Sequence, residues 1–199
     1  MQDELRASNI IAFHDTALQT VRWARVIPPR HAAGVWKYVE LNHRFNSLLW
    51  DEEDLARRRN VADAEIAGNK RAIDNFNQNR NDAVEHIDET LLAQLASVAR
   101  QGEARLSSET AGAMCDRLSI LALKIHAMRV QTQRKDVDEA HLAACRAKLE
   151  KLIEQRSDLG ACLDRLLQEA GAGSSYFKIY RQFKMYNDPK LNPQLYRGK

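Results

Sequence analysis

Helix-breaking residues are scarce in this chain, and that scarcity limits the folds open to it more than any other feature. Only 8 glycines and 4 prolines occur among 199 residues. Between them, apolar residues recur every three or four positions, which places them on one side of an α-helix. The pattern predicts an all-α protein, a helical bundle of about five helices. The expected helices span residues 9–25, 32–59, 64–99, 109–131 and 136–170.

Turn signals separate these segments and divide the chain into two parts. The Pro28–Pro29 pair ends the first expected helix, a polar break over residues 60–63 precedes the third, and Gly171 helps to end the fifth. No stretch shows the strict alternation of a half-buried strand. We therefore expect a helical bundle domain over residues 1–173, followed by a strap or arm over residues 174–199.

The bulk composition is that of a folded protein without a membrane span. Hydrophobic residues make up 44% and charged residues 29% of the chain. No apolar run approaches the roughly 18 residues that a membrane-spanning helix requires. The acidic start, Met1–Glu4, leads into no apolar core, so no secretory signal is expected. The three cysteines are an odd number and are expected to be core thiols in a reducing cytosol. We therefore expect a cytoplasmic protein.

The C-terminal arm is the basic part of the chain. Its six lysines and arginines against Asp188 give it a charge of +5, although the whole chain carries only +3. Residues 176–186 are aromatic and basic and are compatible with one short helix, whereas the stretch after Asp188 is expected to be extended or turn-like. Such an arm could bind nucleic acid by stacking and phosphate contacts. A strap whose aromatic rings pack on the bundle is favoured, because exposed rings are costly.

Charged and polar side chains interrupt the apolar stripes of four expected helices. At about 100° per residue, Glu52 falls between Leu48 and Leu55 in the stripe of the second helix. Arg156 takes an apolar position in the stripe of the fifth helix. The other such residues lie in or beside the stripes of the third and fourth helices: Asn69, Lys70, Asn77, Arg80, Asn81, Asp88, Asp116, Arg117 and Lys124.

These inward charges permit two interpretations, and the sequence leaves both open. Charged side chains are almost never buried without partners, because an unpaired buried charge costs several kcal/mol. They could form a structural network of ion pairs and amide hydrogen bonds that fixes the helix register. Alternatively they could form a ligand or catalytic site, since arginine binds carboxylate or phosphate in a bidentate fork.

One weak pattern suggests a di-iron centre. Glu40 and His43 have the Glu-x-x-His spacing of di-iron bundles, and Asp138 with His141 repeats that spacing loosely. Glu40 and His43 project away from the apolar stripe of their helix, however, whereas metal-bridging ligands must point inward. No metal ligand is therefore predicted from this pattern.

A second weak pattern suggests magnesium. Glu85 and Asp88, together with Glu52 and Glu53, resemble the acid pairs with which all-helical nucleotide pyrophosphohydrolases hold Mg²⁺. Asp88 and Glu52 could face a common centre, whereas Glu85 lies further round its helix. A magnesium-dependent nucleotide hydrolase is therefore a lesser alternative.

Several blocks of sequence carry a resemblance to a known family. They are residues 41–58, 69–74, 77–82, 87–88, 109–114, 116–125, 155–159 and 180–189. Together these blocks resemble the bacterial family called domain of unknown function 4254, and the likeness extends from about residue 10 to residue 196. One departure is Ala111, where a proline is expected in relatives; proline suits a first helical turn.

The resemblance implies a helical bacterial cytoplasmic protein whose relatives often sit beside genes for surface glycan or lipopolysaccharide synthesis. On that basis we expect an accessory enzyme or binder of an anionic small molecule, such as a sugar phosphate, sugar nucleotide or sugar acid. Its general acid/base would be Glu52 or Asp116. Its ligand-binding residues would be Asn77, Arg80, Arg117, Lys124 and Arg156.

The main alternative is a non-enzymatic scaffold that docks partner enzymes of glycan synthesis. In that case the inward charges would only set the helix register. The sequence specifies no cofactor, and a homo-oligomer is compatible with it.

Overall fold

A computed structural model describes residues 5–181 and 188–196 of the chain, and nearly all of its regular secondary structure is helical. Four long helices are α3 (Gly34–Leu55), α4 (Asp63–Gln94), α5 (Ala111–Thr132) and α6 (Glu139–Gly171). Three short helices are α1 (Ala7–Ala17), α2 (Trp23–Val26) and α7 (Pro193–Tyr196). Two short strands, β1 (Arg105–Leu106) and β2 (Ser175–Tyr176), pair in parallel. The all-α prediction is confirmed.

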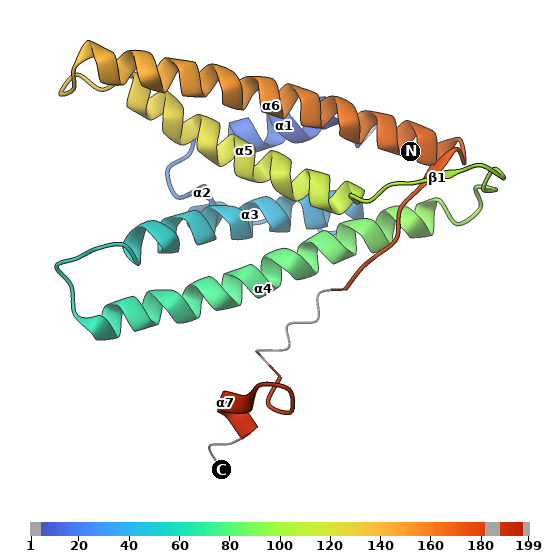
Figure 1. Cartoon of the computed structure of the whole chain (residues 1–199), viewed down its shortest axis with the longest axis horizontal. Helices are drawn as coiled ribbons and strands as arrows, with labels where there is room; N and C mark the ends of the chain where they lie inside the picture. Colours follow the sequence, from blue (N-terminus) through green and yellow to red (C-terminus); the bar gives the residue numbers. More distant parts are fainter. Residues whose placement is uncertain (1–4, 182–187, 197–199) are drawn as a thin grey trace.

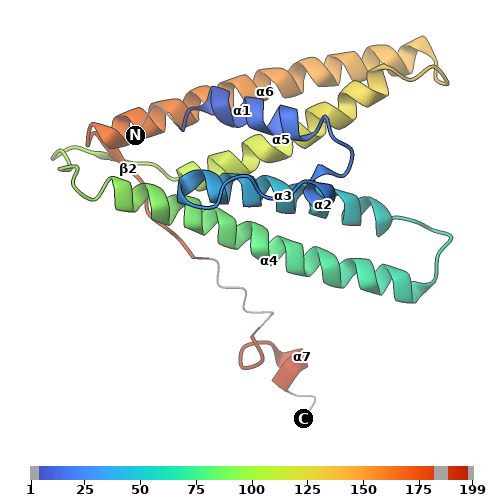
Figure 2. The same cartoon turned by 180° about the vertical axis from the view of Figure 1, so that it is seen from behind.

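The long helices form two hairpins that meet at one end and spread apart at the other. Figures 1 and 2 show α3 beside α4 and α5 beside α6, with α1 against the α5–α6 hairpin. The turn between α3 and α4 and the turn between α5 and α6 both lie at the open end (Figure 1). Consequently α3 and α5 run in the same direction and diverge along it.

The main hydrophobic core fills the end where the hairpins meet. Ile10 of α1, Val39 of α3, Ile87 of α4, Leu118 of α5 and Leu163 of α6 are all essentially inaccessible to solvent. These positions belong to the first halves of α3 and α5 and to the second halves of α4 and α6. The opposite halves of α3, α5 and α6 therefore continue beyond the main core.

The first expected helix is two helices, which corrects the prediction of one helix over residues 9–25. Helix α1 ends at Ala17 and α2 begins at Trp23. Arg22, directly before α2, has a φ of 54°, in the left-handed region that interrupts a right-handed helix. The change of direction lets Trp23 turn back and join Leu48 of α3 in a second, smaller apolar cluster.

Side chains cap the starts of α5 and α6. The Thr110 hydroxyl accepts a hydrogen bond from the Ala113 amide at the start of α5, and Asp138 caps α6 in the same way. After α6, Gly173 has a φ of 77°, and the Ser174 amide donates to the Glu169 carbonyl at 3.0 Å. This Schellman motif requires the left-handed conformation that glycine adopts without strain.

Three local predictions beyond α6 need correction or lie outside the described residues. The β1–β2 pairing was not expected, because two residues are too few to show an alternating pattern. Residues 177–181 are not helical, and the rest of the expected helix to Tyr186 lies outside the described residues. Residues Pro193–Tyr196 form α7 where a turn-like segment was expected; proline is well suited to a first helical position.

The start of the arm is held against the bundle. Phe177 is 2% exposed and belongs to the main core. Arg181 donates from its two terminal nitrogens to Glu85 and Glu89 of α4, at 2.7 and 2.6 Å.

The structure also bears on the cysteines and on the expected lack of a membrane span. Cys115 and Cys145 are buried as expected but Cys162 is exposed, and no described helix is apolar over a length sufficient to cross a bilayer.

Candidate functional site

The side of α3 that faces away from its apolar stripe is buried. Glu40 is 1% and His43 0% exposed, which corrects the expectation that both project away from the interior. The physical reason is that α1 and α2 cover this side of α3. His14 of α1 stacks on His43 with ring centroids 4.2 Å apart, and Trp23 of α2 stacks on it at 5.1 Å. The indole nitrogen of Trp23 also donates to the Ser47 hydroxyl at 3.1 Å.

Glu40 anchors the segment that precedes α3. Its carboxylate accepts hydrogen bonds from the backbone amides of Arg30 and His31 at 3.0 Å, and from Arg44 at 3.3 Å. The His31 ring lies 2.7 Å away. Burial raises the pKa of Glu40, but the hydrogen bonds from Arg30 and His31 outweigh it and leave the pKa below its usual value. The Glu40 carboxylate is therefore occupied by hydrogen bonds from Arg30, His31 and Arg44.

His14 and His43 are buried in their neutral form. Burial is the main reason that the pKa of each lies below its usual value, and that of His43 falls to about 3. Nδ1 of His43 lies 2.8 Å from the Ser119 hydroxyl. Neither ring nitrogen of His14 has a hydrogen-bond partner among the described residues. These rings therefore act at neutral pH as packing groups between α1, α2 and α3.

A polar cluster joins α3, α4 and α5 next to these rings. The amides of Asn42 and Asn46 donate to the same oxygen of Asp116, at 2.8 and 2.9 Å. Asn46 also donates to the Ser119 hydroxyl at 3.0 Å. Arg80 of α4 lies 3.8 Å from the other Asp116 oxygen. Of the predicted site residues, the structure therefore brings Arg80 and Asp116 together.

Glu52 and Arg156 are buried as their positions indicated, but each pairs elsewhere. Glu52 accepts hydrogen bonds from Arg25 at 2.9 Å and from Asn69 at 2.7 Å. Arg156 donates to Asp15 of α1 at 2.6 Å. Glu52, Arg80 and Arg156 thus have three different sets of partners, as in a structural network.

The remaining predicted residues have different surroundings. Asn77 is partly buried on α4. Arg117 is exposed and binds both oxygens of Glu109, at 2.7 and 2.8 Å. Lys124 is also exposed, and it lines a cavity. The ligand and catalytic roles of all these residues stay predictions.

The acids considered for magnesium are engaged with the chain. Asp88 accepts a hydrogen bond from the Gly112 amide at 2.7 Å, and Glu85 binds Arg181. Burial raises the pKa of Asp88 to about 6, against hydrogen bonds from Thr110 and Gly112 that lower it. Within the described residues, no group of three or more histidines, cysteines or acids could hold a metal ion.

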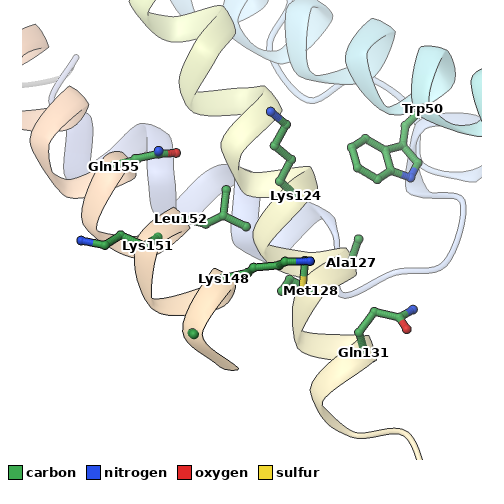
Figure 3. A pocket seen from close by; sticks show the side chains of 10 residues that line it. Trp50, Lys124, Ala127, Met128, Gln131, Lys148, Lys151, Leu152 and Gln155 are labelled. Atoms are coloured by element: carbon green, nitrogen blue, oxygen red, sulfur yellow. The ribbon is translucent and has the colours of Figure 1, made fainter. Parts of the chain in front are cut away.

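A large cavity lies at the open end of the bundle. Its volume is about 700 Å³, and its walls come from α3, α5 and α6. Figure 3 shows Trp50 of α3 facing Lys124, Ala127 and Met128 of α5, with Leu152 of α6 on the far side. The lining residues are Trp50, Lys124, Ala127, Met128, Gln131, Ala147, Lys148, Lys151, Leu152 and Gln155.

The cavity follows the polar cluster along the same two diverging helices. Trp50 lies one helical turn beyond Asn46 on α3, and Lys124 lies five residues beyond Ser119 on α5. Where α3 and α5 are close, polar side chains fill the space between them. Where the helices have diverged, a cavity remains between them.

The cavity is cationic. Three lysines and no carboxylate are among its ten lining residues. Lys151 forms an ion pair with Glu154 at 2.6 Å. Within the described residues, neither Lys124 nor Lys148 has a carboxylate within ion-pair distance. Sequence reasoning had singled out Lys124 alone, because Lys148 and Lys151 have the spacing of an ordinary solvated helix face.

Fold and site together define the class: an all-α bundle protein with a polar interior and a lysine-rimmed cavity at its open end. The chain belongs to the family described as "Protein of unknown function (DUF4254)", whose model matches residues 36–179. The matched segment contains every residue that lines the cavity. No curated protein and no solved structure matches the chain.

Proposed function

We propose that this protein binds an anionic small molecule in the cavity between α3, α5 and α6. The observation that carries the proposal is a cavity of about 700 Å³ with three lysines and no carboxylate in its lining. That volume lies within the roughly 300–1,000 Å³ of small-molecule sites. Because Lys124 and Lys148 have no carboxylate partner among the described residues, an incoming anion would not have to displace one.

Binding accounts for the cavity without a chemical step. Glu52 and Asp116, the predicted acid/base residues, do not line the cavity, and both already accept hydrogen bonds. The proposed role is therefore that of a binder, in the bacterial cytoplasm and in surface glycan synthesis as the family resemblance implies. Sugar phosphates, sugar nucleotides and sugar acids all carry the required negative charge.

A thermal-shift experiment tests the proposal. The panel comprises inorganic phosphate, glucose 1-phosphate, uridine diphosphate, glucuronate and decanoate. A ligand at 100 times its Kd stabilises the folded protein by about 2.7 kcal/mol, which corresponds to about 5–10 °C in Tm. We expect at least one anion to raise the Tm of the wild type and to raise that of the double variant Lys124→Ala, Lys148→Ala much less.

The matched control is Lys135→Ala. Lys135 is an exposed lysine of the α5–α6 turn that does not line the cavity. This variant removes a nearby positive charge but should keep the full shift. The proposal is rejected if no anion stabilises the wild type, or if the double variant responds as strongly as the wild type.

A further inference from the structure

The walls of the cavity are mostly hydrocarbon, and they come from three helices. Trp50 of α3, Met128 of α5 and Leu152 of α6 are its large apolar residues, and Ala127 and Ala147 also line it. The stems of the lysines add further methylene groups. A ligand that fills this space must therefore bury apolar surface of its own, since an apolar wall gains nothing from a hydrated group.

Hydroxyl groups would find almost no acceptors in the cavity. The lining contains no serine, threonine, asparagine, aspartate or glutamate, and its two glutamines supply the only side-chain oxygens. The oxygen of Gln131 already accepts a hydrogen bond from Arg134 at 3.2 Å. A sugar or ribose held there would thus find few hydrogen-bond acceptors in the protein and would gain little affinity from its hydroxyls.

The positive charges beside this apolar space come from α5 and α6. In Figure 3 the side chain of Lys148 extends from α6 into the cavity, whereas Lys151 points away from it, consistent with its ion pair to Glu154. Lys124 belongs to the facing wall on α5. Two lysines on facing helices therefore offer positive charge beside the apolar residues of the cavity.

We propose that the ligand is a single-chain amphiphilic anion, a phosphate or carboxylate joined to a hydrocarbon chain. The chain lies between Trp50 and Leu152, and the anionic group meets Lys124 and Lys148. This inference rests on the proposed function and narrows its ligand class. A polar group attached beyond the anion would extend into solvent, where its hydroxyls stay hydrated. The ligand enters as a monomer, because the cavity is a local space between three helices and its lining comes from all three.

Calorimetric titration of the full chain with a series of alkyl phosphates tests this inference. Hexyl, octyl and decyl phosphate are used below their micelle concentrations, beside uridine diphosphate and glucose 1-phosphate. Each buried methylene group contributes about 0.8 kcal/mol, so Kd should fall about fourfold for each one added. Uridine diphosphate and glucose 1-phosphate should bind at least 100-fold more weakly than decyl phosphate.

Two variants separate the contributions of the charge and of the chain. Lys148→Ala should weaken every alkyl phosphate by about the same factor, roughly tenfold. Leu152→Gln places an amide in the apolar wall and should flatten the dependence on chain length. Lys135→Ala serves again as the control and should bind the series like the wild type. Circular dichroism of each variant verifies that its helices are intact.

The possible outcomes distinguish this inference from the proposed function. If uridine diphosphate or glucose 1-phosphate binds as tightly as decyl phosphate, or if chain length has no effect, the amphiphile inference is wrong and the proposed function stands. If no anion binds, both are wrong. If the protein binds phosphatidylglycerol vesicles but not monomeric alkyl phosphate, the cavity faces a membrane surface and the inference of a monomeric ligand is overturned.

Discussion

Asn46 of α3 donates its side-chain amide to the carboxylate of Asp116 in α5 at 2.9 Å, inside a cluster where Asn46 itself is only 4% exposed. This contact joins the two hairpins between the main core and the cavity. Because buried polar groups must be paired, the contact fixes how α3 and α5 align. The alignment in turn fixes where Trp50 and Lys124 face one another.

Removing the Asn46 amide should destabilise the fold. The variant Asn46→Ala leaves Asp116 and Ser119 each short of a buried hydrogen bond, and we expect the free energy of unfolding to fall by about 1–3 kcal/mol. Urea denaturation measures the change. Asn79→Ala is the control, because the amide of Asn79 bonds only to Asn75 one turn away in α4, and its loss should cost under about 0.5 kcal/mol. Equal losses would show that the cluster has no special role.

A glycine holds α5 close to α4. A Cβ at Gly112 would lie 2.5 Å from the Val84 carbonyl oxygen and 3.0 Å from the Asp88 carboxyl, so Gly112→Ala must push the helices apart. We expect a loss of about 1–3 kcal/mol in the free energy of unfolding. Gly68→Ala in α4 is the matched control, since its Cβ meets nothing within 4 Å. That variant should gain about 0.5–1 kcal/mol. Losses of similar size at both positions would contradict the close packing at Gly112.

The stacked histidines should make the protein sensitive to acid. The pKa values of His14 and His43 are below the ordinary value of 6.5, so below that pH the unfolded chain binds more protons than the folded one. The contribution of the two histidines to the free energy of unfolding should therefore fall as the pH is lowered from 7 to 4. His14→Phe keeps an aromatic ring against His43 but cannot be protonated, and should lose less stability over this range. His126→Gln, at an exposed position, should follow the wild type. An unchanged acid dependence in His14→Phe would exclude this role.

Periodicity in the sequence predicted the four long helices and some of the inward charges, whereas Arg117 and Lys124, which lie beside an apolar stripe, are exposed. Glu52, Asp88 and Arg156 interrupt apolar stripes, and all three are buried in the structure. Their partners could not be predicted in the same way. Arg156 pairs with Asp15, far away in the sequence, and a helical stripe indicates which side of a helix is buried but not which helix covers it.

Two other features had no local signal at all. His43 looked exposed because it lies off the apolar stripe of α3, and only the reversal at Arg22 brings Trp23 over it. The cavity exists because two hairpins diverge, and divergence depends on packing at the other end of the bundle. Lys148 therefore has an ordinary surface spacing in the sequence and a position at a cavity in the structure.

Asp88 should produce a pH dependence opposite in sign to that of the histidines. Its pKa is raised by burial to about 6, above the ordinary value of 3.8, so between these values the folded chain binds more protons than the unfolded one. The free energy of unfolding contributed by Asp88 therefore falls as the pH rises from about 4 to about 6. A shift of about two pKa units corresponds to roughly 3 kcal/mol, and the side chain is only 3% exposed, so solvent screens little of it.

The variant Asp88→Asn isolates this contribution. Its amide oxygen can still accept from the Gly112 amide, but it cannot ionise. Urea denaturation of both proteins at pH 4, 5, 6 and 7 gives the difference between their free energies of unfolding. The effect of the histidines cancels in this difference, because both proteins contain them. We expect the free energy of unfolding of Asp88→Asn minus that of the wild type to increase by up to about 3 kcal/mol between pH 4 and pH 7, because only the wild type loses stability when Asp88 ionises. Asp82→Asn, on the exposed side of α4, should show a flat difference. A flat difference for Asp88→Asn as well would mean that this carboxyl titrates normally despite its burial.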